Sequence, residues 1–238
     1  WWDGKGYFLH GNDGAGQRIY GDGYFESTAN YFSILWGVAK PGQSRRIWSY
    51  LDSHPEIEEP FPVLTNHLPR NAARRMDYGH TVTDGDVWLT LGAHAAVARL
   101  RSGYMQEATR MVKAIVDYEL KEGTIHNNVY PDGTSNKDWS PEIGNYGSLF
   151  TLLVEGVLGL SPMSNGLLIA PMRLEGMNGF KTVAPLAYAG KEFYLEVSWK
   201  GGHRPEVRMD GRKRRASKRG YMLPPEFDDG CTLAMAYR

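Results

Sequence analysis

The sequence contains a single cysteine, Cys231, among its 238 residues. One cysteine cannot form an intrachain disulfide, so a disulfide framework is excluded and the cellular compartment stays open. Long hydrophobic runs are also missing, because no segment approaches the roughly 20 apolar residues that a membrane-spanning helix needs. No signal-peptide pattern is visible, since no basic segment leads into an apolar stretch at the start. We therefore expect no membrane partner.

An excess of charge of one sign is absent as well. Lys plus Arg and Asp plus Glu number 27 each, and hydrophobic residues make up 42% of the chain. This balance is typical of a soluble globular protein and gives no electrostatic reason to expect a nucleic acid as partner. The one basic run, residues 212–215, follows an Asp-Gly turn. We interpret it as the solvated end of a hairpin, with contact to an acidic polysaccharide as the alternative.

Patterns typical of metal and nucleophile sites are missing too. The seven histidines show no i, i+4 pair, so no zinc site is predicted. No serine stands in a nucleophile-elbow pattern. The Gly-rich segment 1–25 lacks the spacing of a calcium-binding loop. We expect neither a metal nor an organic cofactor.

What the sequence does contain is helical periodicity followed by strand periodicity. Apolar residues recur every three or four positions from about Glu26, and Lys40-Pro41-Gly42 ends the run. Similar spacing predicts four further helices, at 43–53, 86–101, 104–121 and 146–160.

From Gly166 onward the period changes to two. Short alternating segments are separated by Gly, Pro and Asp-Gly turns, and Phe193 and Leu195 should face away from Tyr194 and Glu196. Helices followed by strands in blocks predict an α+β chain with two domains, 1–165 and 166–238.

One loop carries the chemistry. Residues 138–146, DWSPEIGNY, place the carboxylate Glu142 between Trp139 and Tyr146, directly before an apolar helix. Such a carboxylate could perform acid/base chemistry on a sugar. Equally, it could only satisfy backbone donors at the helix entrance and interact with the helix dipole. The residues themselves leave both interpretations open.

Three segments resemble a known family. They are EGVLGLSPMSNGLLIAP at 155–171, FKTVAPLAYAGKEFYLEVSWKGG at 180–202 and TDGDVWLTLGAHAA at 83–96. Together they resemble the six-hairpin (α/α)6 glycosidases, and most closely the C-terminal region of the cellobiose/maltose phosphorylase and glucoamylase-like group. The resemblance implies the C-terminal part of an (α/α) barrel over 1–165, followed by a small antiparallel β-sandwich module over 166–238.

The resemblance also implies a role for Glu142. In the hydrolases of this group, a glutamate before the last inner helix activates water, whereas the phosphorylases hold phosphate there with hydroxyl groups. A carboxylate at this place would repel phosphate, which favours hydrolysis. We therefore predict an exo-acting, inverting glycoside hydrolase acting on an oligosaccharide or glycoside. Its general acid is expected upstream of Trp1, in an N-terminal part of the same polypeptide, with Asp84, Asp86 and Asp3 as alternatives.

Further residues are predicted to line the sugar subsite. Aromatic rings can stack on a pyranose, and polar side chains near a helix start can bond its hydroxyls, although such rings are often core and such aspartates often caps. The predicted residues are Trp88, Trp139, Tyr130, Asn145, Asp84 and Asp86. Three other functions stay open: a glycoside phosphorylase, a toroid polysaccharide lyase and a non-catalytic saccharide-binding fragment.

Overall fold

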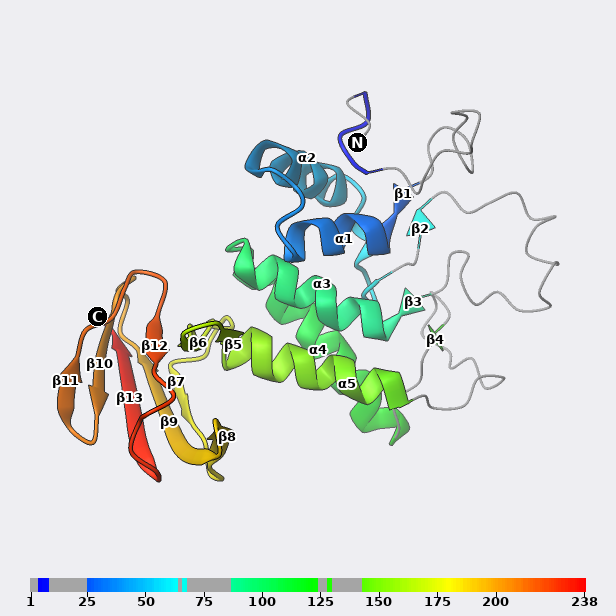
Figure 1. Ribbon diagram of the computed structural model, residues 1–238. Helices are drawn as coiled ribbons and strands as arrows, with labels where there is room; N and C mark the ends of the chain where they lie inside the picture. The colour runs from blue at the N-terminus through cyan, green and yellow to red at the C-terminus, as the bar shows by residue number, and fades with distance from the viewer. Residues whose placement is uncertain (1–3, 9–24, 64–65, 68–86, 124–127, 130–142) are drawn as a thin grey trace. The chain divides into compact units, whose positions relative to one another are not determined.

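The computed structural model describes residues 4–8, 25–63, 66–67, 87–123, 128–129 and 143–238 (Figure 1). The chain is α+β and divides into two compact units, Trp1–Leu152 and Leu153–Arg238, each with its own hydrophobic core. The first unit is helical and the second is rich in sheet. The predicted domains 1–165 and 166–238 stay a prediction. No helix of the described residues is long and apolar enough to cross a membrane.

The helices of the first unit lie close to the predicted ranges, except that α5 ends nine residues before the predicted position 160. They are α1 (Ser27–Leu35), α2 (Pro41–Asp52), the 3-10 turn η1 (Pro55–Ile57), α3 (Leu89–Arg101), α4 (Met105–Glu122) and α5 (Ile143–Thr151). Two small sheets precede α1 and α3. Strand β1 (Phe25–Glu26) pairs with β2 (Asn66–His67), and β3 (Val87–Trp88) pairs with β4 (Asn128–Val129). Helix α3 therefore begins at Leu89 and not at Asp86 as predicted.

Helices α1, α3 and α5 run in the same direction, with their N-terminal ends on one side of the unit, while α2 and α4 run in the opposite direction (Figure 1). Helix α3 packs against α1, α4 and α5. Alanines at 93, 95, 96 and 98 are fully buried, because small side chains let α3 approach its neighbours on several sides. The described residues form no closed helical ring, so the predicted barrel is not shown.

Hydrophobic spacing identifies the inner face of α2 and only part of the inner face of α4. Ile47, Trp48 and Leu51 of α2 are buried. On α4, Met111 is buried but Val116 is 41% exposed.

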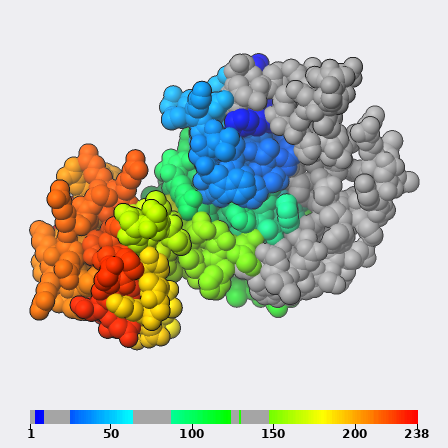
Figure 2. Space-filling model, in the orientation of Figure 1, coloured from blue at the N-terminus to red at the C-terminus, as the bar shows by residue number. Residues whose placement is uncertain are grey.

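Hydrophobic spacing identifies the inner face of α1 only in part. Trp36 at its end is 70% exposed, whereas Asn30 is buried. The amide of Asn30 accepts from the backbone N–H of Phe8 at 2.8 Å and donates to the carbonyl of Glu26 at 2.8 Å. These hydrogen bonds offset the cost of burying a polar group, so hydrophobic spacing does not decide which face lies inside. Figure 2 shows the side chains of α1 and α2, in blue, as one continuous surface.

The second unit begins within a short π-helical segment, η3 (Leu152–Val157). Its strands begin at Leu160, earlier than the predicted Gly166. Strands β5 (Leu160–Met163), β6 (Gly166–Ile169) and β12 (Tyr221–Leu223) form a three-stranded sheet. A six-stranded sheet has the order β11-β10-β13-β9-β7, with β8 also paired to β9. Its strands are β7 (Gly179–Lys181), β8 (Leu186–Tyr188), β9 (Lys191–Trp199), β10 (Pro205–Met209), β11 (Arg212–Arg214) and β13 (Cys231–Tyr237). Side chains of both sheets share one core, as in a sandwich.

The second unit is not purely antiparallel as predicted. Strands β9 and β13, the two longest, pair in parallel. Three strands lie between them in the chain, so the backbone can return to the end where β9 began, which a tight hairpin cannot do. The predicted alternation is confirmed: Phe193 and Leu195 are fully buried, and Tyr194 and Glu196 are exposed.

Candidate active site

Much of the predicted site lies outside the described residues. This holds for Glu142, Trp139, Tyr130, Asp84 and Asp86, and also for Asp3. The structure describes elements that are adjacent to some of them in the sequence. Helix α5 begins at Ile143, the residue that follows Glu142 in the sequence.

Trp88 is the one predicted sugar-lining residue whose side chain is described. It immediately precedes α3, pairs with Asn128 across the β3–β4 sheet, and its backbone N–H donates to the carbonyl of Val63 at 2.9 Å. The indole is partly buried against the core of the first unit, so it is both a packing residue and partly accessible. Asn145 lies in the first turn of α5, where the structure describes its backbone alone.

The N-terminal ends of α1, α3 and α5 share a chemical property. The first four N–H groups of a helix lack intrahelical acceptors, and the helix dipole places partial positive charge there. At α1 the carboxylate of Glu26 meets this need, accepting from the N–H of Thr28 at 3.1 Å and that of Ala29 at 2.5 Å. Sequence reasoning missed Glu26, because serine, threonine, aspartate and asparagine are the usual N-cap residues.

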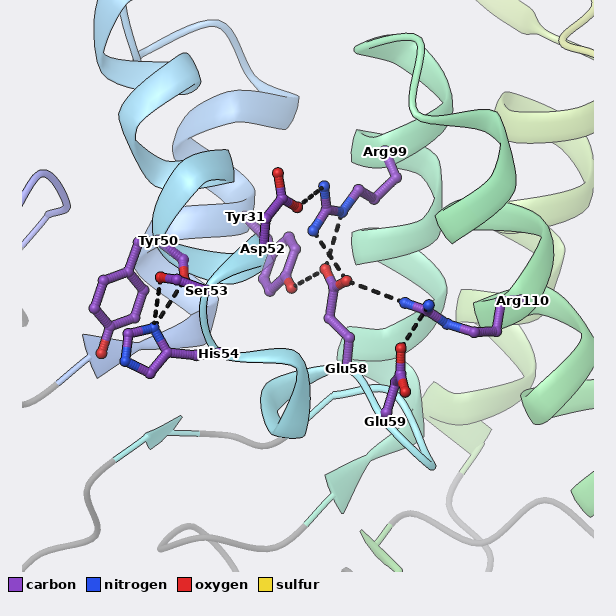
Figure 3. A network of polar contacts seen from close by, with 9 residues as sticks. All are labelled: Tyr31, Tyr50, Asp52, Ser53, His54, Glu58, Glu59, Arg99 and Arg110. Carbon is purple, nitrogen blue, oxygen red and sulfur yellow. Dashed lines mark hydrogen bonds and ion pairs between the residues drawn. The ribbon is translucent and has the colours of Figure 1, made fainter.

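A second feature missed from the sequence is a buried ionic cluster between α1, α2, η1 and α3 (Figure 3). Arg99 donates from Nε and Nη2 to the two oxygens of Glu58, each at 3.0 Å, and from Nη1 to Asp52 at 3.1 Å. The hydroxyl of Tyr31 donates to Glu58 at 2.6 Å. Burial, reinforced by the charge of Glu58, raises the pKa of Tyr31 well above its ordinary value, so this hydroxyl keeps its proton.

This cluster is closed to a substrate. Arg99 is 1% exposed and Glu58 4% exposed, and the guanidinium of Arg99 lies 4.4 Å from the ring centre of Trp48. Arg110 reaches Glu58 at 3.8 Å from α4, while also pairing with Glu59 at 2.5 Å. Ten residues of helix separate Arg99 from Leu89, about 15 Å along the axis from the N-terminal end of α3. The cluster ties α1, α2, η1, α3 and α4 together.

One described carboxyl group titrates near neutral pH. Burial raises the pKa of Glu119 from 4.5 to about 7. One of its oxygens is buried and has no hydrogen-bond partner among the described residues. Glu119 lies in the last turn of α4, and no motif marks it among the acidic residues of that helix. Within the described part of the chain, no group of three His, Cys, Asp or Glu side chains could hold a metal ion.

No protein-family model matches the chain, and no curated protein matches its sequence. Among solved structures, it is similar to a family GH92 alpha-mannosidase from Bacteroides thetaiotaomicron, with 16% identity and a TM-score of 0.26 over 62% of this chain and 17% of that one. The same enzyme in complex with mannoimidazole gives 16% identity and a TM-score of 0.30, over 86% of this chain and 24% of that one. The chain thus spans less than a quarter of that enzyme's length. Scores this low do not define a shared fold.

Proposed function

We propose that this chain is part of an exo-acting, inverting glycoside hydrolase in which Glu142 activates water. The observation that carries the proposal is the start of α5 at Ile143, beside α3 in a row of parallel helices whose N-terminal ends share one side (Figure 1). Glu142 directly precedes this helix in the sequence, and Trp88 directly precedes α3. Partial positive charge at a helix N-terminus favours an ionised carboxylate, the form that a general base requires.

Inversion needs two carboxyl groups about 6.5–9.5 Å apart, with room for a water molecule under the anomeric carbon. Glu142 accepts a proton from this water while the oxygen of the water bonds to the anomeric carbon. The bond to the leaving oxygen breaks as a second carboxylic acid donates a proton to it. As in the resembled group, this acid would come from an earlier helix upstream of Trp1, with Asp84, Asp86 and Asp3 as alternatives. No metal ion or cofactor takes part in these steps.

The sugar would lie against the same helix ends. Trp88 supplies a partly accessible ring there. Trp139 and Tyr130 would add stacking surfaces, while Asn145, Asp84 and Asp86 would bond hydroxyl groups. These roles follow the family resemblance and the positions of the residues in the sequence.

The row of helices also supports the expected N-terminal partner segment. Helix α3, in the middle, is buried on several sides, whereas the flanking helices expose Trp36, at the end of α1, by 70% and Phe150 of α5 by 69%. Large apolar side chains at both edges of the row fit further helices of the same polypeptide packing there, as a larger (α/α) assembly would need.

The test is Glu142→Gln in the full-length natural protein. Removing a general base lowers kcat by about 10²–10⁴, and the wild-type product should carry the anomeric configuration opposite to that of the substrate. Glu122→Gln, which changes an exposed glutamate at the end of α4, is the matched control and should keep full activity. A kcat loss below about 10² contradicts the role of Glu142. Turnover that requires phosphate would instead indicate a phosphorylase, and an unsaturated product absorbing in the ultraviolet a lyase.

A further inference from the structure

The exposed face of the six-stranded sheet carries a groove of about 510 Å³ that the proposed hydrolase site does not use. Its floor is on β13, where Ala234 and Ala236 point to the outer face between neighbouring strands. Ala234 lies opposite Glu196 of β9 and Arg208 of β10. Because the two alanines are short and their neighbours are long, the surface is hollowed along the middle of the sheet.

The wall on the β10 side is a fixed polar group. One oxygen of Glu206 accepts from Nε and Nη2 of Arg208, at 3.2 and 3.0 Å, and the other lies 3.4 Å from Nη1 of Arg238. The hydrogen bond from Arg208 and then the charge of Arg238 hold the pKa of Glu206 below its ordinary value. This wall therefore presents a carboxylate between two guanidinium groups, a pattern that can both accept and donate hydrogen bonds.

The opposite wall also mixes charges. Lys181 of β7 lies directly opposite Glu196 of β9, and Ser198 follows on the same face. The wall on the β10 side therefore carries two cations and one carboxylate, and the wall on the β7 side carries one of each. A strongly anionic or cationic ligand would meet like charge on either side, whereas hydroxyl groups can donate to the carboxylates and accept from the cations.

The apolar floor and the polar walls together favour one class of ligand. A pyranose has a face of C–H groups and a rim of hydroxyls, so its face can lie on Ala234 and Ala236 while its rim bonds the walls. A volume of 510 Å³ falls within the range of small-molecule sites, about 300–1,000 Å³. We propose that this groove binds a neutral oligosaccharide, as a second saccharide site that goes beyond the proposed hydrolase.

The experiment is titration of the full chain with an array of neutral gluco-, manno- and galacto-oligosaccharides, followed by calorimetry and amide NMR for those that bind. Bound sugar should shift the amide signals of residues 196–198 and 234–236. Ala234→Met, which fills the floor, should weaken this binding at least tenfold. Thr232→Met is the matched control, because Thr232 is on the same strand and the same face but outside the groove lining, and it should leave binding unchanged.

Three results would overturn the proposal. They are no binding by any neutral sugar of the array, equal weakening by both methionine variants, and binding confined to charged saccharides. Circular dichroism and thermal unfolding check that both variants fold. Hydrolysis separates this site from Glu142: Ala234→Met should still cleave a small aryl glycoside, and Glu142→Gln should still show the shifts at 234–236. Either proposal can therefore fail while the other stands.

Discussion

At the scale of single residues, Glu58 holds several buried polar contacts. Its carboxylate balances Arg99 at 1% exposure and also accepts from Tyr31. Glu58→Gln keeps the shape of the side chain but removes the buried charge that faces the guanidinium, and it leaves only the half-exposed Asp52 as an ionic partner of Arg99. Breaking a buried pair in this way costs about 3–5 kcal/mol. We expect a loss of that size in the free energy of unfolding, measured by urea denaturation of the first unit in the full chain.

The exposed pair Lys113–Asp117 on α4 provides the control for this substitution. Asp117→Asn should change the unfolding free energy by less than about 1 kcal/mol, because exposed ion pairs are screened by water. An equal, small effect of both substitutions would show that the cluster does not hold the helices together.

Glu119 should make stability depend on pH. Its pKa rises from 4.5 to about 7 on folding, so between these values the unfolded chain has released the proton that the folded chain still holds. The stability contribution is therefore present below about pH 4.5 and is lost as the pH rises through 7. A shift of this size would be worth about 3 kcal/mol, and solvent screening of a partly exposed group reduces this to roughly 1–2 kcal/mol.

The check is thermal unfolding of the full chain between pH 4.5 and 8. Glu119→Gln should reduce the fall in unfolding temperature with rising pH over this range, because a neutral amide does not titrate. Glu122→Gln, at an exposed position on the same helix, should keep the wild-type slope. The same slope in Glu119→Gln as in the wild type would assign the pH dependence to other groups.

At the scale of elements, two glycines in helices should respond to alanine with opposite signs. A Cβ at Gly92 of α3 would lie 2.4 Å from the carbonyl oxygen of Pro62, so the chain at Pro62 would have to move. Overpacking of this kind costs about 1–3 kcal/mol. A Cβ at Gly147 of α5 would meet nothing within 4 Å, and alanine there should stabilise the helix by about 0.5–1 kcal/mol.

Thermal unfolding of the two variants side by side tests this expectation. Gly92→Ala should unfold at a lower temperature than the wild type, and Gly147→Ala at a higher one. A higher unfolding temperature in both variants would mean that the backbone at Pro62 moves away from the new Cβ without loss of stability.

Element positions follow from local pattern, which is why the helices and the alternation along β9 were predictable. Partners far apart in the chain were not. The parallel pairing of β9 with β13 depends on the path of the three strands between them. The burial of Arg99 depends on Glu58, which is 41 residues away in the sequence. A signal for Arg99 did exist, since it is a charged residue within LTLGAHAAVARL, a helix that is apolar on nearly every side.

The candidate site was predictable to a smaller extent. The family resemblance singled out Glu142, and the structure describes a helix that starts directly after it. Trp88 was expected to line the sugar subsite, and this stays a prediction; the structure shows its ring partly buried against the first core. The groove on β13 was not predicted, because a floor of alternating alanines is ordinary in a strand until the lengths of its cross-strand neighbours are known.

At the scale of the whole molecule, the two cores share no residue, and this should be visible in unfolding. Leu233 of β13 is fully buried in the second core, as Glu58 is in the cluster of the first unit. Leu233→Ala removes buried methyl groups, which costs about 2–5 kcal/mol. It should speed amide exchange in β9, β10 and β13 while leaving α3 and α4 unchanged, and Glu58→Gln should do the reverse. Hydrogen exchange with mass spectrometry resolves these peptides, and the double variant should lose the sum of both free energies to within about 0.5 kcal/mol. If either substitution speeds exchange equally in both sets of peptides, the two cores unfold as one cooperative body.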